Sequence, residues 1–103
     1  MTRRIVRVTD QFFEDLDNYL GPERGPNGEP STMDFIRLDL MPIVDAFAGR
    51  FDDLLEAVPG HPEQRVLITA GRLVPRIAAT GVLTVDGEVE LVQLDLDLDS
   101  PWS

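Results

Sequence analysis

The stretch EQRVLITAGRLVPRIAATGVLTVDGEVELVQLDLDLD, residues 63–99, decides the fold of this chain. It predicts three consecutive antiparallel strands, over residues 64–70, 73–85 and 88–99. The dipeptide Asp86-Gly87 joins the last two strands and is a strong signal for a tight hairpin. The C-terminal part of the chain is therefore expected to form an antiparallel sheet.

Two irregularities in this stretch predict departures from a regular ladder. Pro75 and Gly81 lie within the middle strand, where they indicate a bulge or a close approach of another part of the chain. In the last strand, the apolar residues alternate with polar ones except for one slip at Val92-Gln93.

The N-terminal half predicts a short strand followed by two helices. Residues 3–9 alternate as a strand, and a helix follows over 11–20, capped by Thr9 or Asp10. A longer apolar stripe at helical spacing predicts a second helix over 32–58.

Proline and glycine divide this half of the chain. Residues 21–31 contain three prolines and three glycines and are expected to form a loop. Pro42 lies within the second expected helix, where it removes a backbone hydrogen bond, so we expect a kink or a break near Met41. Pro59-Gly60 ends this helix.

The predicted order is β-α-α-β-β-β, an α+β fold with two helices packed on one face of an antiparallel sheet. Residues 1–99 are expected to form one domain, with 100–103 as a short tail. The chain has no cysteine, which excludes disulfides and thiolate metal sites. It shows neither a bilayer-length apolar run nor a signal-peptide pattern, so we expect a cytoplasmic protein without a membrane partner.

Charge is sorted by position along the chain. The formal net charge is −10, and all nine bases are arginine. This balance argues against direct nucleic-acid binding over the whole surface, because attraction to phosphates needs a positive footprint. Residues 64–85 hold three arginines and no acid, whereas residues 86–99 hold six acids and no base.

These arginines are the candidate partner-binding residues: Arg65, Arg72 and Arg76, joined by Arg3 and Arg7 if the first strand is adjacent. Residues of like parity project from one face of a strand, so Arg65 and Arg76 could meet on the concave side of the sheet. Clustered arginines repel each other and need an anion. Two interpretations stay open. Either an acidic partner segment binds them, or they pair within the chain with Glu88, Glu90, Asp95 and Asp97.

Patterns for catalysis or metal binding are weak. Asp95, Asp97 and Asp99 share a strand face, but the glycine turn and distal glutamate of a calcium loop are missing, which favours a solvated face or a charge-protected edge. His61 is the only histidine, and no serine or cysteine nucleophile signature accompanies it. We therefore expect no metal, no cofactor and no catalytic residue.

The element order and three segments resemble the RelE/ParE toxin superfamily over nearly the whole chain. The segments are RVTDQFFEDL (7–16), QRVLI (64–68) and VPRIAATGVL (74–83), with the long second helix between the first two. The resemblance implies a toxin of a type II toxin–antitoxin system, bound by an acidic and apolar antitoxin segment. Some members cleave mRNA on the ribosome, and others poison DNA gyrase without a nuclease site.

Only Arg65 and Arg76 match arginines of the ribonuclease members. The family's lysines have no counterpart here, its strand-four arginine falls in the acidic run 94–99, and the only tyrosine is Tyr19 on the first helix. Cleavage without these cations would lack its main electrostatic stabilisation. We therefore expect ParE-like inhibition by protein binding, with an antitoxin and a cellular enzyme as partners. The alternatives are an acidic stand-alone module, such as a phage-encoded inhibitor or nucleic-acid mimic, and a degenerate mRNA endoribonuclease.

Overall fold

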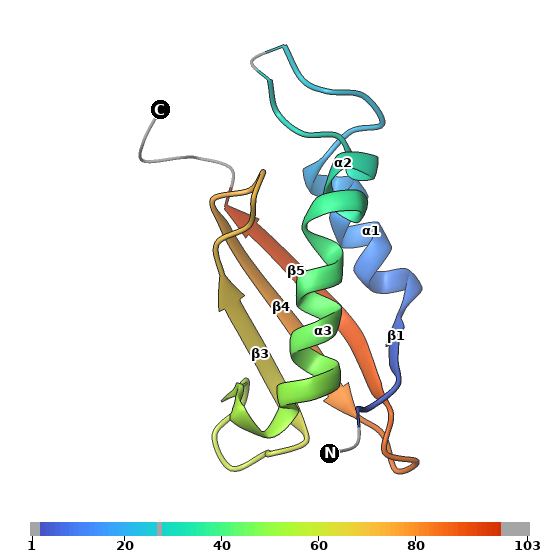
Figure 1. Cartoon of the computed structure of the whole chain (residues 1–103), viewed down its shortest axis with the longest axis vertical. Coiled ribbons are helices and arrows are strands. Elements are labelled where there is room, and N and C mark those ends of the chain that lie inside the picture. The colour runs from blue at the N-terminus through green and yellow to red at the C-terminus, as the bar shows by residue number, and fades with distance from the viewer. Residues whose placement is uncertain (1–2, 27, 98–103) are drawn as a thin grey trace.

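The computed structural model describes residues 3–26 and 28–97 (Figure 1). Its elements are β1 (Val6–Val8), α1 (Asp10–Tyr19), α2 (Thr32–Leu38), α3 (Leu40–Arg50), the 3₁₀ turn η1 (Phe51–Asp53), β2 (Leu55–Glu56), β3 (Gln64–Thr69), β4 (Arg76–Leu83) and β5 (Val89–Asp97). The expected tail, 100–103, and the end of the last expected strand, 98–99, lie outside the described residues.

The five strands form one sheet in the order β1-β5-β4-β3-β2. β1 runs parallel to β5, and the other neighbouring pairs are antiparallel. The three helices lie along one side of this sheet (Figure 1), so the α+β prediction is confirmed. The core between the two layers is built mainly from fully buried aromatic and aliphatic side chains, among them Phe12, Leu16, Phe35, Ile43, Phe47, Ile77, Val89, Leu91 and Leu94.

Helix α1 forms where the apolar spacing predicted it. Thr9 is its N-cap, and the Thr9 hydroxyl accepts a hydrogen bond from the Phe12 amide at 3.3 Å. Phe12 and Leu16, one turn apart, are both buried. The helix therefore turns one apolar face to the sheet and leaves Asp10, Glu14 and Asp17 exposed to solvent.

The long second helix is broken, as Pro42 predicted. The break lies at Asp39, between α2 and α3, three residues before the proline. This position is favourable because Pro42 then lies in the first turn of α3, where backbone N–H groups have no hydrogen-bond acceptor within the helix, so the lack of an N–H costs nothing.

The expectation that this helix reaches Val58 is wrong. Helix α3 ends at Arg50, and the chain turns through η1 into β2, whose Leu55 and Glu56 pair with Val66 and Arg65. Leu55, which matched the apolar spacing of a helix, belongs instead to an edge strand and is 62% exposed. After η1, the chain pairs with β3 and does not continue the α-helical hydrogen bonds.

The hairpin between β4 and β5 is confirmed, with a longer loop than two residues. The Gly87 amide donates to the Thr84 carbonyl at 3.0 Å, and the Thr84 amide donates to the Glu88 carbonyl at 2.8 Å. Gly87 has a φ of 82°, while Asp86 keeps a negative φ. A two-residue type I′ turn would need positive φ at both central positions, so the loop is the three-residue kind that ends in a left-handed glycine.

Both a bulge and a close approach, the two features that the sequence predicted near Gly81, are present. The register between β4 and β5 shifts there, because Thr80 faces Gln93 and Gly81 faces Leu91, which leaves Val92 as the extra residue of a bulge. A Cβ at position 81 would lie 2.6 Å from the Phe47 ring of α3. The helix layer approaches the sheet so closely here that only glycine fits.

A capping box fixes the start of α2 and predicts a pH dependence. Ser31 Oγ accepts from the Asp34 amide, and the Asp34 carboxylate accepts from the Ser31 amide at 3.0 Å. Arg24 binds the same carboxylate through Nε at 2.9 Å. The Arg24 guanidinium first, and then the Ser31 amide, hold the pKa of Asp34 well below its ordinary value.

Because the folded-state pKa is depressed, this contribution to stability is present above the unfolded pKa of about 3.9 and is lost as the pH falls below it. We expect the wild-type thermal midpoint to fall more steeply below about pH 4 than that of Asp34→Asn, which keeps the shape of the cap and cannot titrate. Calorimetry over a pH series measures this difference. Parallel profiles for the two proteins would contradict it.

Candidate functional site: a groove between α3 and β3

The expected cluster of Arg65 and Arg76 does not form. Arg65 pairs with Gly81 across β3 and β4, and Arg76 lies five residues before Gly81 on the same strand. An odd separation along a strand places two side chains on opposite faces. Arg65 therefore lies on the helix side, with Gly81, and Arg76 on the uncovered side. The prediction was wrong because the β3–β4 register decides which residues of the two strands share a face. The sequence separation of Arg65 and Arg76 does not reveal this register.

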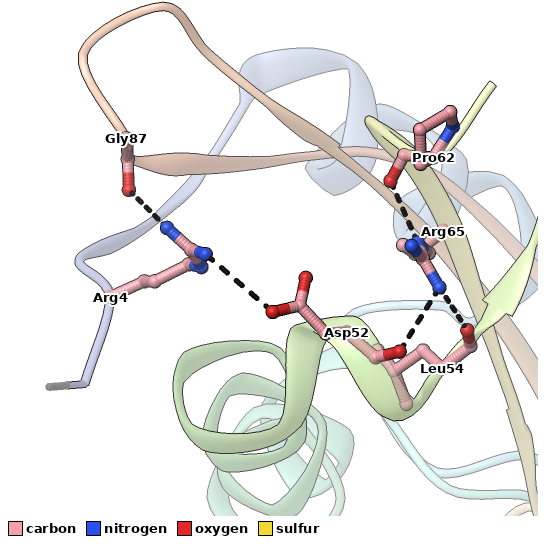
Figure 2. Close-up of polar contacts among 6 residues, drawn as sticks. All are labelled: Arg4, Asp52, Leu54, Pro62, Arg65 and Gly87. Atoms are coloured by element: carbon pink, nitrogen blue, oxygen red, sulfur yellow. Dashed lines mark hydrogen bonds and ion pairs between the residues drawn. The ribbon is translucent and has the colours of Figure 1, made fainter. Parts of the chain in front are cut away.

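Arg65 is bound by backbone carbonyl groups (Figure 2). Its Nε donates to Pro62 O at 2.7 Å, and its Nη1 donates to Leu54 O at 2.8 Å and to Asp52 O at 3.2 Å. Its guanidinium carbon also lies 5.7 Å from the centroid of the Phe51 ring. Arg65 thus holds the turn from η1 into β2 against β3, and its role is structural.

Arg4, which the sequence did not single out, supports the same corner of the molecule. Its guanidinium carbon also lies 5.7 Å from the Phe51 ring centroid. Figure 2 shows its contacts with Gly87 O at 3.5 Å and with an Asp52 carboxylate oxygen at 4.0 Å. Both distances are long, so the stacking on Phe51 matters more than these polar contacts.

Arg3, Arg7 and Arg76 do not build an anion site either. Arg3 pairs with Asp45 at 2.9 Å and Arg7 with Glu88 at 2.8 Å, so for these two the interpretation of internal pairing holds. Strand β1 lies at the far edge of the sheet from β3, next to β5. Arg76 is exposed at the start of β4, in register with Asp97 of β5.

A groove of about 180 Å³ lies between α3 and β3, and we call it the α3–β3 groove. Its apolar walls are Pro42, Ile43 and Ala46 from the helix and Leu67 and Ile77 from the sheet. Two features leave this groove open. Ala46 of α3 has a small side chain here, and β2 ends opposite Val66, so no described strand lies on that side of the rest of β3.

Two arginines border the α3–β3 groove, Arg50 from the last turn of α3 and Arg72 from the β3–β4 loop. Both are exposed, and neither forms a salt bridge with any carboxylate in the described part of the chain. The sequence did not identify Arg50. Helical spacing could have done so, because Ile43, Ala46 and Arg50 share one face of a helix.

Asp39 lies at the base of the groove and positions Arg72. Its side chain is buried, and its two carboxylate oxygens accept from the Arg72 amide at 2.7 Å and from the Leu73 amide at 3.1 Å. Gly71 permits this approach, because a Cβ there would lie 2.6 Å from Asp39 Oδ2. Asp39 was not predicted from the sequence, although it lies between Phe35 and Ile43 at helical spacing, where a carboxylate needs buried donors.

A second hollow, about 470 Å³ and widely open, lies between α1 and β5 and has mostly polar walls. Desolvation and the nearby Asp95 carboxylate raise the pKa of Tyr19, whose hydroxyl donates to Asp95 Oδ1 at 3.2 Å. Asp15 accepts a hydrogen bond from the Leu94 amide at 3.0 Å. Asp15, Tyr19 and Asp95, which line this hollow, are therefore hydrogen-bonded within the chain.

The described residues contain no group of three or more histidine, aspartate or glutamate side chains placed to hold a metal ion. His61 lies in an exposed loop, with Nδ1 3.1 Å from Glu63 Oε1. None of the described helices combines the length and apolar character that crossing a bilayer requires.

Comparison of the chain with family models, with curated proteins and with solved structures finds no significant match. The geometry of the site is therefore the basis for proposing a function.

Proposed function

We propose that this chain is a toxin-like component of a type II toxin–antitoxin system that acts by protein binding and inhibition rather than by catalysis. The observation that carries the proposal is the α3–β3 groove, whose apolar walls lie between two arginines that lack a carboxylate partner among the described residues. An acidic and apolar segment of an antitoxin is the occupant with matching chemistry.

The distribution of arginines supports such a partner. In a chain of net charge −10, five of the nine arginines are engaged by carboxylates or carbonyl oxygens, namely Arg3, Arg4, Arg7, Arg24 and Arg65. Arg50 and Arg72 keep exposed guanidinium groups at one groove. Arginine suits this role because its planar donors can bind a carboxylate in a bidentate manner.

The placement of Arg65 favours protein binding over RNA cleavage. Arg65 and Arg76 are the two positions that resemble the ribonuclease members, and they lie on opposite faces of the sheet. Arg65 directs its donors at three backbone carbonyls, so it is not available to a phosphate. A cleavage mechanism would need these cations together at the developing charge.

Charge reversal in the groove tests the proposal. We expect induction of the wild-type chain to arrest growth of a bacterial host, and co-expression of the neighbouring open reading frame to relieve the arrest. The double variant Arg50→Glu/Arg72→Glu should arrest growth without being relieved, because each lost pair weakens the complex by roughly 1–3 kcal/mol. Titration calorimetry of the purified pair at two salt concentrations gives the affinity.

Arg76→Glu is the matched control for this experiment, because Arg76 is an exposed arginine on the opposite face of the sheet. It should bind the antitoxin as the wild type does. Absence of growth arrest would contradict a toxin. Equal affinities for the wild type and the groove double variant would contradict the groove as the binding site.

A further inference from the structure

The two outer strands cover only part of their neighbours, so the sheet has two overhanging edges. β1 pairs with β5 only from Val89 to Leu91, although β5 continues to Asp97. β2 pairs with β3 only at Arg65 and Val66, although β3 continues to Thr69. Each overhang leaves a row of backbone groups without a neighbouring strand, and proteins usually protect such rows against unwanted pairing.

The β5 overhang is protected by α1. Asp15 accepts the hydrogen bond of the Leu94 amide at 3.0 Å. Tyr19, one helical turn later, places its hydroxyl on Asp95 and beside the backbone amide of Leu96. Residues four apart on a helix and two apart on a strand advance by similar lengths, about 6 Å and about 6.6 Å, so the two side chains reach successive outward amides.

The β3 overhang has no such protection. The Ala57 amide donates to the Gln64 carbonyl, so the backbone groups of Gln64 point toward β2. The period of two places those of Val66 and Ile68 on the same side. Since β2 reaches only Val66, the amide and carbonyl of Ile68 have no strand beside them, and no described side chain is hydrogen-bonded to them. The Ile68 side chain is 58% exposed.

This open edge borders the α3–β3 groove, since Leu67 and Thr69 of β3 line it. A strand added beside β3 would direct alternate side chains toward the helix layer, where the groove has apolar walls. Main-chain hydrogen bonds would supply affinity, and the groove would select the side chains. Arg50 and Arg72 would meet carboxylates on the same segment.

We propose that an extended acidic and apolar segment of a partner protein adds to β3 as a further strand, in line with β2, through the backbone of Ile68. This mode of binding rests on the proposed function, since it assumes that the α3–β3 groove takes an acidic segment. A second copy of the chain is a less suitable occupant, because pairing two such edges would gather the groove arginines of both copies without a carboxylate between them.

Synthetic peptides test the strand addition. The probe is a heptapeptide with glutamate at positions 1 and 7, valine at positions 3 and 5 and threonine at positions 2, 4 and 6, so that the glutamate and valine side chains share one strand face. Its matched control carries N-methyl groups on alternate amides, which keep the side chains and charges but remove main-chain donors. We expect the probe to bind in the low-millimolar range or tighter and the N-methylated peptide to bind at least about tenfold more weakly. Hydrogen exchange of the Ile68 amide, followed by NMR, should slow when the probe binds.

Two variants separate this inference from the proposed function. Ile68→Pro removes only an outward-pointing donor, a change that edge strands tolerate, and it should abolish probe binding, whereas Ile68→Thr should not. If both peptides bind equally, or the Ile68 amide stays unprotected, strand addition is overturned while arginine-dependent binding stands. If no peptide binds and Arg50→Glu/Arg72→Glu changes nothing with the antitoxin, the proposed function fails as well. A dimer that protects the Ile68 amide without peptide would also overturn the inference.

Discussion

Replacing Asp39 by alanine is expected to lower the free energy of unfolding by about 2–4 kcal/mol, measured by urea denaturation. The carboxylate accepts two backbone hydrogen bonds, from the Arg72 amide at 2.7 Å and from the Leu73 amide at 3.1 Å. Both donors lie in a partly buried loop, and hydrogen bonds to a charged acceptor are among the stronger ones. Alanine would leave both amides without an acceptor and a small void beside Gly71.

Asp39→Asn separates hydrogen bonding from packing. Asparagine keeps the volume but offers one acceptor and one donor, so one of the two amides would face an N–H group and lose its bond. We expect Asp39→Asn to lie between the wild type and Asp39→Ala. Asp45→Ala is the control, since its pair with Arg3 is exposed and should contribute less than about 1 kcal/mol. Equal midpoints for Asp39→Ala and Asp45→Ala would contradict the role of Asp39.

Asp39 also links the stability of the loop to the groove. The loop residue that it binds, Arg72, is one of the two arginines at the α3–β3 groove. A variant that loosens the loop should therefore weaken binding of an acidic segment even though Asp39 itself carries the opposite charge to Arg72. If simple electrostatics governed binding, removal of this carboxylate would strengthen it, so the sign of the change distinguishes the two mechanisms.

The parts of the fold that depend on local pattern could be predicted from the sequence. Alternation placed β3, β4 and β5, helical spacing placed α1, and Pro42 predicted the break between α2 and α3. These features are local because a strand face, a helix stripe or a missing N–H is set by residues a few positions apart. Even the bulge could be predicted, because Gly81 and the slip at Val92-Gln93 are two signs of the same register shift.

The candidate site could not be predicted in the same way, because it depends on contacts between segments. Arg65 and Arg76 have suitable chemistry, but the β3–β4 register puts them on opposite faces. The apolar residues of the segment 51–58 have helical spacing. The segment nevertheless forms η1 and β2, because β3 pairs with it and Arg65 binds its carbonyl groups. Arg72 was identified, while its partners at the groove, Arg50 and Asp39, come from another element and were missed.

The arginines of this chain illustrate why residue type does not decide function. Arg65 and Arg72 come from the same basic stretch of sequence, but one donates to backbone carbonyls and the other keeps an exposed guanidinium group. Arg65 lies where three backbone carbonyl oxygens converge, and these accept its N–H groups. Asp39 binds the backbone amides of Arg72 and Leu73 and leaves the Arg72 guanidinium group without a bond to it.

The second large effect is expected at Gly81, where substitution by alanine should lower the free energy of unfolding by about 1–3 kcal/mol. The added Cβ would lie 2.6 Å from Cε1 and 2.8 Å from Cδ1 of Phe47, a fully buried ring. Neither partner can move freely, because Phe47 belongs to the core and Gly81 lies next to the bulge in β5. The clash outweighs the gain of up to about 1 kcal/mol from replacing a flexible glycine in a regular element.

A double-mutant cycle with Phe47→Leu tests this explanation. Phe47→Leu alone creates a void and destabilises, but it also removes the atoms that the new methyl group meets, so the double variant should lose less stability than the sum of the two single variants. Gly49→Ala is the matched control, because a Cβ in the last turn of α3 meets only the flexible end of Arg3, at 3.4 Å. It should leave stability unchanged or raise it by up to about 1 kcal/mol. Additive effects at positions 47 and 81 would show that the close contact between α3 and β4 does not limit this position.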